Sequence, residues 1–395
     1  MAKIWIRGGH VRPVWAGHPW VYAQAVGKVE GKPEAGDLVD VLDPQDNWMG
    51  AGFYSPSSAI AVRVLSRVPG EAVDLNFFRE RFARALAFRR ESIGLPDAQT
   101  NGYRLIHSEG DGLSGLVVDL YGGVAVVQVL SAGMKRRERE VFDALREVTG
   151  VRTIVEFPSS EHLEKEGLPA QPGAVHGDPV EQLEFRERGF EYRLPIESAQ
   201  KTGYYFDQRD NRARLETLCA GRRVLDACSY VGAFSLAAAR GGAREVVALD
   251  RSEAALAVAQ ESAARNGVAD KIKFQRGDIK RALPEMIAAG ERFDVVVLDP
   301  PKLASSVKHL DKARKAYRAW NAFAFSLCAE NAVLVTCSCS AAMQAHDFLR
   351  TLALASADAR RDTALFALGQ QAADHPTPAA FEEGRYLKAA FMRVS

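Results

Sequence analysis

The sequence predicts an α/β fold in which a doubly wound, Rossmann-like sheet follows a small β-barrel and a small α+β module. From residue 224 onward, short apolar segments alternate with helical segments. These apolar segments lack the alternation of a strand with one exposed face, so both faces of the sheet are expected to be covered. Residues 1–70 instead contain short alternating segments between glycines and prolines, which is typical of a barrel.

The composition is that of an ordinary globular chain. Its 395 residues are enough for two or three domains, and 47% of them are apolar and 26% charged. The net charge of +1 neither indicates nor excludes a nucleic-acid partner, because positive charge can be local. All five cysteines lie in the second half, which favours reduced thiols over a disulfide framework. Without a signal-peptide core or an apolar stretch of about 18 residues, the protein is expected in the cytoplasm.

Residues 1–70 are expected to form the first domain, with strands at Leu38–Leu42 and Ala59–Leu65. Aromatic and basic residues are interleaved here, which suits RNA contact through base stacking and phosphate pairing. The alternative is that most of these aromatic side chains fill the barrel core. As a set, the segment resembles the PUA domain, an RNA-binding barrel attached to many RNA-modifying enzymes. The aromatic residues are Trp5, Trp15, Trp20, Tyr22, Trp48, Phe53 and Tyr54.

Residues 71–195 are expected to form the α+β module, in which we recognise no chemistry. An apolar stripe at helical spacing predicts a helix over residues 71–94. Segments on both sides of Tyr121-Gly-Gly indicate a hairpin. The strands of that hairpin are Leu116–Leu120 and Val124–Leu130, and the remaining elements are a helix at Lys135–Val148, a strand at Val151–Phe157, and a second hairpin at Val180–Glu187 and Phe190–Pro195.

Residues 196–395 are expected to form the sheet domain. The polar and aromatic segment 198–212 precedes the first strand and either closes over a ligand or begins a helix. Ligands of such sheets bind at the carboxyl ends of the strands. Strands are predicted at Val224–Asp226, Val246–Asp250, Ile272–Arg276, Val295–Asp299, Val333–Cys337, Leu365–Leu368 and Leu387–Val394, and helices at about 232–240, 252–266, 278–289, 308–329 and 341–355.

The turn after the first of these strands indicates the cofactor. It reads Asp226-Ala-Cys-Ser-Tyr-Val-Gly232 and lacks the second glycine with which G-x-G-x-x-G approaches a pyrophosphate. An NAD oxidoreductase is therefore disfavoured, and S-adenosylmethionine, which has no phosphate, is favoured. Asp226 suits its cationic end, Asp250 its ribose hydroxyls and Asp278 its adenine amine. The alternative for each aspartate is a helix cap.

Strand four ends in Asp299-Pro-Pro-Lys302. This resembles the Asp/Asn-Pro-Pro-aromatic signature with which many methyltransferases hold a nucleobase or an amide nitrogen. Here Lys302 replaces the aromatic residue, which argues against amino-group methylation. Basic residues follow, suited to phosphate contact or to a solvated helix face. They are Lys302, Lys308, Lys312, Arg314, Lys315 and Arg318.

Strand five ends in Cys337-Ser338-Cys339. Because no second Cys/His pair at ligand spacing accompanies the two cysteines, we expect no metal. Strand alternation makes Cys337 a candidate for a buried structural thiol, while Cys339 lies just before a helix, where a thiolate is stabilised. A thiolate that adds to C6 of cytosine or uracil makes C5 nucleophilic enough to take a methyl group.

From about Ser198 to its end, the chain resembles the class I S-adenosylmethionine-dependent 23S ribosomal RNA cytosine-C5 methyltransferases that carry an N-terminal PUA domain. The resemblance is carried by QKTGYYFDQRDNR (200–212), DACSYVGAFSLAAA (226–239), DPPK (299–302), SCS (338–340), QAADHP (371–376) and EGRYLK (383–388). It implies a class I methyltransferase sheet, Cys339 as the nucleophile, and Asp299 against the cytosine ring. Cys337 departs from the family pattern.

The resemblance also implies that Tyr205, Phe206 and Gln208 help to enclose the cofactor and that large-subunit ribosomal RNA is the partner. A homodimer is common among such proteins, although nothing in this sequence indicates one. The candidate cofactor contacts are therefore Asp226, Ser229, Tyr230, Gly232, Asp250, Asp278, Tyr205, Phe206, Gln208 and Asp299, and the candidate catalytic residues are Cys339 and Asp299.

Two other functions stay open at this point. A uracil-C5 methyltransferase would also use a cysteine after a serine on strand five. A non-catalytic RNA-binding assembly factor with a vestigial methyltransferase core is the second, although the intact acids and thiol argue against it. The target nucleotide and the base that deprotonates C5 do not follow from the sequence.

Overall fold

The computed structural model describes residues 1–157, 164–168, 173–199, 201–304 and 306–395, so Gln200 of the QKTGYYFDQRDNR motif lies outside the described residues. The chain forms two compact units. Unit 1 contains Met1–Gly189, Pro195–Tyr204 and Ala373–Gly384, and unit 2 contains Phe190–Leu194, Tyr205–Ala372 and Arg385–Ser395.

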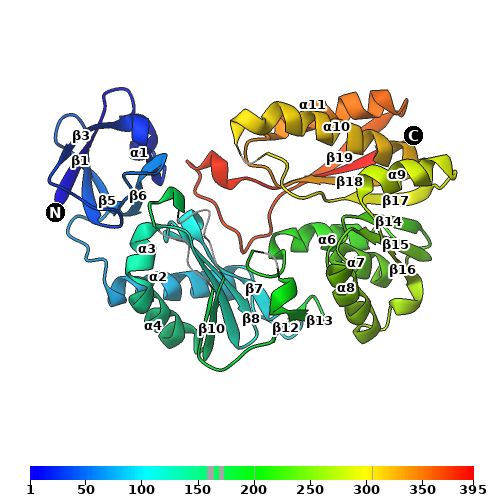
Figure 1. The fold of residues 1–395 in the computed structure, drawn as a ribbon, viewed down its shortest axis with the longest axis horizontal. Helices are drawn as coiled ribbons and strands as arrows, with labels where there is room; N and C mark the ends of the chain where they lie inside the picture. Colours follow the sequence, from blue (N-terminus) through cyan, green and yellow to red (C-terminus); the bar gives the residue numbers. More distant parts are fainter. Residues whose placement is uncertain (158–163, 169–172, 200, 305) are drawn as a thin grey trace. The chain divides into compact units, whose positions relative to one another are not determined.

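The N-terminal part of unit 1 is the predicted barrel-like sheet (Figure 1). Leu38–Leu42 forms a strand as predicted, and the strand predicted at Ala59–Leu65 lies one residue later. The core is aliphatic, built from residues such as Ile4, Val39 and Val62. The strands are β1 (Ala2–Ile6), β2 (Trp20–Tyr22), β3 (Val26–Glu30), β4 (Leu38–Leu42), β5 (Trp48–Tyr54) and β6 (Ile60–Ser66), in the order β2-β6-β5-β4-β1-β3, with the helix α1 (Val11–Trp15).

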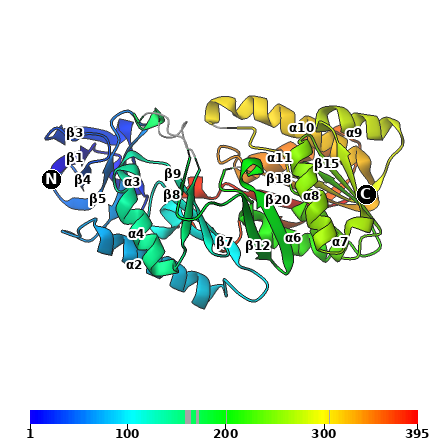
Figure 2. The same ribbon diagram turned by 60° about the horizontal axis from the view of Figure 1, so that its bottom comes forward.

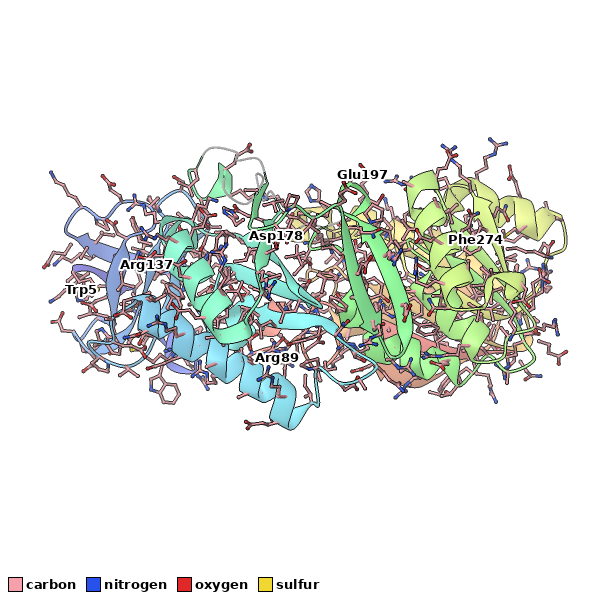
Figure 3. All side chains as sticks on the ribbon, turned by 90° about the horizontal axis from the view of Figure 1, so that it is seen from below. Trp5, Arg89, Arg137, Asp178, Glu197 and Phe274 are labelled. Atoms are coloured by element: carbon pink, nitrogen blue, oxygen red, sulfur yellow. The ribbon has the colours of Figure 1, made fainter. Side chains whose placement is uncertain are left out.

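Most of the aromatic residues of this sheet lie outside its aliphatic core. Trp15 is 74% exposed. Trp5, labelled in Figure 3, donates its indole N–H to Asp46 and lies under the ammonium of Lys28, 4.4 Å from the ring centroid. The alternative that the aromatic residues fill the barrel core is therefore wrong for the tryptophans, whose polar N–H groups require partners that an aliphatic core does not offer.

The second part of unit 1 contains a sheet in the order β11-β10-β9-β8-β7, with α2 and α4 packed together (Figure 2). The predicted helix at Lys135–Val148 is interrupted at Arg137, labelled in Figure 3, because that residue leaves helical geometry with φ −109° and ψ 19°. The elements are α2 (Leu75–Ala87), β7 (Gly102–His107), β8 (Leu116–Tyr121), β9 (Val124–Val129), α3 (Ala132–Arg136), α4 (Glu138–Thr149), β10 (Thr153–Glu156), β11 (Ala174–His176) and β12 (Gln182–Glu187).

A late segment of the chain, Ala373–Gly384, also belongs to unit 1. Arg89, wholly buried and labelled in Figure 3, donates to the backbone oxygen of Asp374 at 2.7 Å. The Oδ2 atom of Asp374 accepts from the backbone N–H of Arg104 at 2.9 Å. These bonds satisfy buried polar groups, so the segment is held specifically within this unit.

Unit 2 contains the predicted doubly wound sheet, in the order β16-β15-β14-β17-β18-β20-β19. Every strand predicted after residue 224 is present, and β18 begins five residues before its predicted start, at Cys328 rather than Val333. The strands are β14 (Arg223–Ala227), β15 (Glu245–Asp250), β16 (Ile272–Arg276), β17 (Phe293–Leu298), β18 (Cys328–Ser338), β19 (Thr363–Gly369) and β20 (Lys388–Val394), and β13 (Phe190–Pro195) precedes them.

Helices cover both faces of this sheet, as the uninterrupted apolar strands require (Figure 1). The core on one side joins β14, β17 and β18 to α9, α10 and α11 through residues such as Leu283, Phe325 and Phe348. The helices are α6 (Arg209–Glu216), α7 (Ala233–Arg240), α8 (Glu253–Arg265), α9 (Ile279–Ala288), α10 (Leu310–Leu327) and α11 (Ala345–Asp358). No helix in the described part of the chain is long and apolar enough to cross a membrane.

Candidate active site

Cys339 directly follows β18 and is half-buried, whereas Cys337, within the strand, is fully buried. The neighbouring Ser340 fixes the end of this segment, because its Oγ accepts from the backbone N–H of Ala304 at 3.1 Å and lies 3.3 Å from the hydroxyl of Tyr317. Burial raises the pKa of the Cys337 thiol well above its usual value. The accessible sulfur at this strand end is therefore that of Cys339.

Asp299 follows the adjacent parallel strand, β17, in which Leu298 is paired with Thr336 of β18. The amide of Gln208 donates to Asp299 Oδ2 at 3.1 Å, and Asn211 orients that amide by donating to its oxygen at 2.6 Å. Burial, together with the charges of Asp207 and Asp226, raises the pKa of Asp299 to about 7. This carboxyl group therefore exchanges its proton near neutral pH.

Asp226 lies at the carboxyl end of β14 and is buried. Its Oδ2 accepts from the hydroxyl of Ser235 at 2.6 Å, and burial raises its pKa to about 7. Gly232, at φ +75°, directly precedes α7, and a Cβ there would come within 2.9 Å of Ala259 Cβ. Only glycine combines this left-handed backbone with such close packing.

Asp250 joins two loops at the carboxyl end of β15. Its Oδ2 accepts from the backbone N–H of Tyr230 at 2.9 Å, and its Oδ1 accepts from that of Ser252 at 2.8 Å. Asp278 is different, because it is exposed and caps α9 by accepting from the backbone N–H of Lys280 at 2.9 Å. Asp278 therefore caps a helix, which was the alternative to its predicted contact with the adenine amine of the cofactor.

The segment Tyr205–Gln208 lies beside the turn after β14, which contains Tyr230. The rings of Tyr205 and Tyr230 pack edge to face with centroids 5.4 Å apart, and Phe206 and Gln208 are buried. Arg212, at the start of α6, holds the segment by donating to the backbone oxygen of Tyr205 at 3.0 Å. Segment 198–212 thus both contributes to the site and begins a helix.

The basic residues after Asp299 divide into two groups. Arg314 pairs with Asp311 and Asp347, and Arg318 makes two bonds to Asp358, at 2.6 and 2.7 Å. The lysines of the group are exposed: Lys302, Lys308, Lys312 and Lys315.

Comparison with known proteins identifies both parts of the chain. Residues 4–67 match the model of a PUA-like domain, and residues 101–363 match that of an S-adenosylmethionine-dependent methyltransferase. The chain is 38% identical over 393 residues to ribosomal RNA large subunit methyltransferase I of Aeromonas salmonicida, and the matched region covers 99% of both chains. It is 36% identical to the protein of the same name from Escherichia coli, again over 99% of both chains.

The chain belongs to the ribosomal RNA large subunit methyltransferase I family. Solved structures agree with the fold: an S-adenosylmethionine-dependent methyltransferase from Streptococcus mutans matches all of both chains with a TM-score of 0.85 at 20% identity. A methyltransferase solved in complex with SAH matches with a TM-score of 0.86, also at 20% identity. The predicted fold class, the PUA-like domain, the methyltransferase activity and the cofactor are confirmed.

The residues of this methyltransferase fit S-adenosylmethionine. Among the described residues, Asp226 Oδ1 and Ser229 Oγ are buried without a hydrogen-bond partner, and both line the turn after β14. Buried acceptors of this kind cost free energy unless a ligand satisfies them. The bound cofactor supplies a methyl group on a sulfonium. The chain's own acids would hold its cationic and hydroxyl-bearing ends.

The candidate site residues named from the sequence omit three that the structure places at this site, of which Asp207 was considered only as part of segment 198–212, either closing over a ligand or capping a helix. Lys388 begins β20 opposite the end of β18, Asp207 accepts from the hydroxyl of Tyr386 at 2.7 Å, and Arg212 is buried beside Asp226 and Asp299. One signal was available for Lys388, because it is a lysine directly before the apolar run Ala-Ala-Phe-Met of the strand KAAFMRV. The other two depend on side-chain orientation, which the sequence pattern does not contain.

Proposed function

We propose that this protein methylates C5 of a cytosine in large-subunit ribosomal RNA through a covalent bond between Cys339 and C6 of the base. The observation that carries the proposal is the half-buried Cys339 at the end of β18, with Asp299 at the end of the adjacent strand. The name shared by the curated relatives supports ribosomal RNA as the substrate. Because this RNA is made inside the cell, we place the protein in the cytoplasm.

The proposed chemistry begins at Cys339. Its thiolate adds to C6, which forms an S–C bond and moves the electron pair of the C5–C6 double bond toward C5 and N3. C5 then takes the methyl group from the sulfonium of the cofactor, leaving the neutral thioether. A base removes the proton from C5, the C6–S bond breaks, and the aromatic ring and the thiolate are restored. Asp299 lies against the ring during these steps.

The burial of the two thiols supports Cys339 over Cys337 as the nucleophile. Cys337 is fully buried and its raised pKa disfavours a thiolate, whereas Cys339 is accessible at the strand end. The raised pKa of Asp299, about 7, supports its place against the cytosine ring, because a neutral carboxylic acid can donate a hydrogen bond to N3 of the cytosine.

The deciding experiment is nucleoside analysis of the product. Ribosomal RNA from a strain lacking this gene is incubated with the protein and labelled cofactor, digested, and separated. We expect the label in 5-methylcytidine, at a position that is unmodified in the deletion strain. Label in 5-methyluridine would replace cytosine by uracil as the target. Cofactor binding without labelling of any nucleoside would instead support an RNA-binding assembly factor.

We expect Asp250→Asn to weaken cofactor binding about 10- to 100-fold. The substitution removes a charged acceptor for the ribose hydroxyls, and hydrogen bonds to charged groups contribute about 1.5–3 kcal/mol. Titration calorimetry with S-adenosylmethionine measures the change. The matched control is Asp270→Asn, which neutralises an exposed acid next to β16 and should leave the affinity unaltered. Equal affinities for both variants would remove Asp250 from the cofactor site.

The lysines after Asp299 are expected to contribute more to RNA binding than the arginines, although all six belong to the proposed contact surface. Replacing Lys308, Lys312 and Lys315 by alanine should lower the slope of log affinity against log salt concentration by about 2, roughly 0.7 for each phosphate that is no longer neutralised. Arg318→Ala should change it less, because Asp358 already holds that guanidinium. Binding of a ribosomal RNA fragment at several salt concentrations measures both, and a larger effect of Arg318 would contradict the assignment.

A further inference from the structure

Lys388 is a buried cation next to the proposed nucleophile. It is 4% exposed and begins β20, where it is paired with Ser338 in the antiparallel register between β18 and β20. The residues that follow it in the strand are largely apolar. Burying an ammonium in such a setting is costly unless hydrogen bonds and a charge partner compensate.

The hydrogen bonds of Lys388 hold the segment that carries Cys339. Its Nζ donates to the backbone oxygen of Ser340 at 2.8 Å and to that of Tyr386, also at 2.8 Å. The β-sheet pairing to Ser338 and the bond to Ser340 therefore fix the residues immediately before and after Cys339. An ammonium has three N–H donors, and these two carbonyl oxygens, which are neutral, account for two of them.

The Lys388 ammonium and the Cys339 thiolate stabilise each other. Burial lowers the pKa of Lys388 to about 8, and the thiolate of Cys339 opposes this shift by favouring the ammonium. Below about pH 8 the side chain is therefore positively charged and favours the thiolate in return. The other titratable groups around the pair are Tyr205, Asp207, Asp299, Tyr317 and Cys337, with Arg212 facing Asp299.

The acids in this set oppose a thiolate. The charge of Asp207 contributes to the raised pKa of Asp299, so negative charges already repel one another at this strand end. A further negative charge on Cys339 would be disfavoured by the same repulsion. A cation near Cys339 offsets this repulsion, and Lys388 is placed to supply it.

We propose that Lys388 is a positioning residue for Cys339: its ammonium holds the Ser338–Ser340 segment in place and stabilises the thiolate at the end of β18. Its catalytic meaning rests on the proposed function, in which Cys339 is the nucleophile. The effect on the thiol itself is independent of that function, because it concerns the free protein without RNA or cofactor.

The test is the pH dependence of alkylation of Cys339 by iodoacetamide, which reacts with thiolates and is followed for each cysteine by mass spectrometry. In Lys388→Met, which keeps the length of the side chain, we expect the midpoint of the rate profile to rise by about one pH unit. At pH 7 the rate should fall about threefold, because the less acidic thiolate is also more nucleophilic. Lys388→Arg keeps the positive charge, so its midpoint should stay close to that of the unmodified protein.

Matched controls separate charge from structure. Lys273→Met removes an exposed lysine from β16 and should leave the midpoint unaltered, and the half-buried Cys228 reports on general loosening in every variant. Circular dichroism establishes that the variants fold.

An unaltered midpoint in folded Lys388→Met would overturn the proposal, and so would an equal rise in Lys388→Met and Lys388→Arg. If the midpoint moves as expected but Cys339→Ala still methylates RNA, the proposed function fails and this inference about the thiol stands.

Discussion

Cys339→Ala is expected to abolish methyl transfer to ribosomal RNA, with a loss of roughly 10⁴-fold or more, the scale seen when a nucleophile that acts with its partners is removed. The reason is that C5 of cytosine is a poor nucleophile until the thiolate has added to C6. Cofactor binding should be retained, because the cofactor turn lies after β14 and not after β18. Single-turnover transfer of labelled methyl groups measures the rate.

Cys337→Ala is the control for this experiment. Its thiol is fully buried two residues earlier on the same strand, so we expect methyl transfer within about tenfold of the unmodified protein and a modest loss of stability from the small cavity. RNA that contains 5-fluorocytosine should form a stable adduct with the unmodified protein and with Cys337→Ala. An adduct that forms with Cys339→Ala would assign the nucleophile to another residue.

The second large effect is expected for Asp299→Ala, which should lower turnover about 10²- to 10⁴-fold, the usual contribution of a positioned acid or base. When the thiolate adds to C6, negative charge develops toward N3, and a protonated Asp299 can donate to that atom. The variant loses this donor. Asp299→Asn keeps a hydrogen-bond donor but not an acidic proton, so its turnover should lie between that of the unmodified protein and that of Asp299→Ala.

The pH dependence of turnover tests this role by its sign. The pKa of Asp299 is raised to about 7, so its acid form is present below pH 7 and is lost as the pH rises through that value. The thiolate fraction of Cys339 changes in the opposite direction, and the two together predict a bell-shaped profile. In Asp299→Asn the decline near pH 7 should disappear, so that turnover continues to rise with the thiolate fraction of Cys339. A decline near pH 7 that persists in Asp299→Asn would assign it to another group.

The strands of the methyltransferase sheet could be located from the sequence almost to the residue, because buried parallel strands are uninterrupted apolar segments. Ile272–Arg276 is observed as predicted, and Val246–Asp250 begins one residue earlier, at Glu245. The interruption at Arg137 was not predictable, because the segment on both sides of it keeps helical periodicity. The start of β18 was also placed too late, because the strand includes the polar residues Glu330 and Asn331 before its apolar part.

The candidate site was less completely predictable, and Asp278 shows why. An aspartate after a strand can bind a ligand or cap the next helix, and only the structure reveals that its carboxylate accepts from the backbone of α9. For Arg314 and Arg318, sequence spacing could not indicate the acids Asp347 and Asp358, which lie on another helix. For the two arginines the partner is set by folding, whereas Asp278 has a local partner that the sequence offers as one of two alternatives.

By itself, the sequence determined the order of strands and helices, the phosphate-free cofactor turn between Asp226 and Gly232, and the strand ends that carry Asp299 and Cys339. These features are local, because they depend on periodicity, turn chemistry and the identity of single residues. Only the tertiary structure decided that Cys337 is inaccessible while Cys339 is not, that two carboxyl groups at the strand ends exchange protons near neutral pH, and that Lys388 lies against the segment of Cys339. Burial and charge proximity are set by packing between elements far apart in the chain, so a local pattern such as the strand alternation at Cys337 can suggest them but cannot decide them.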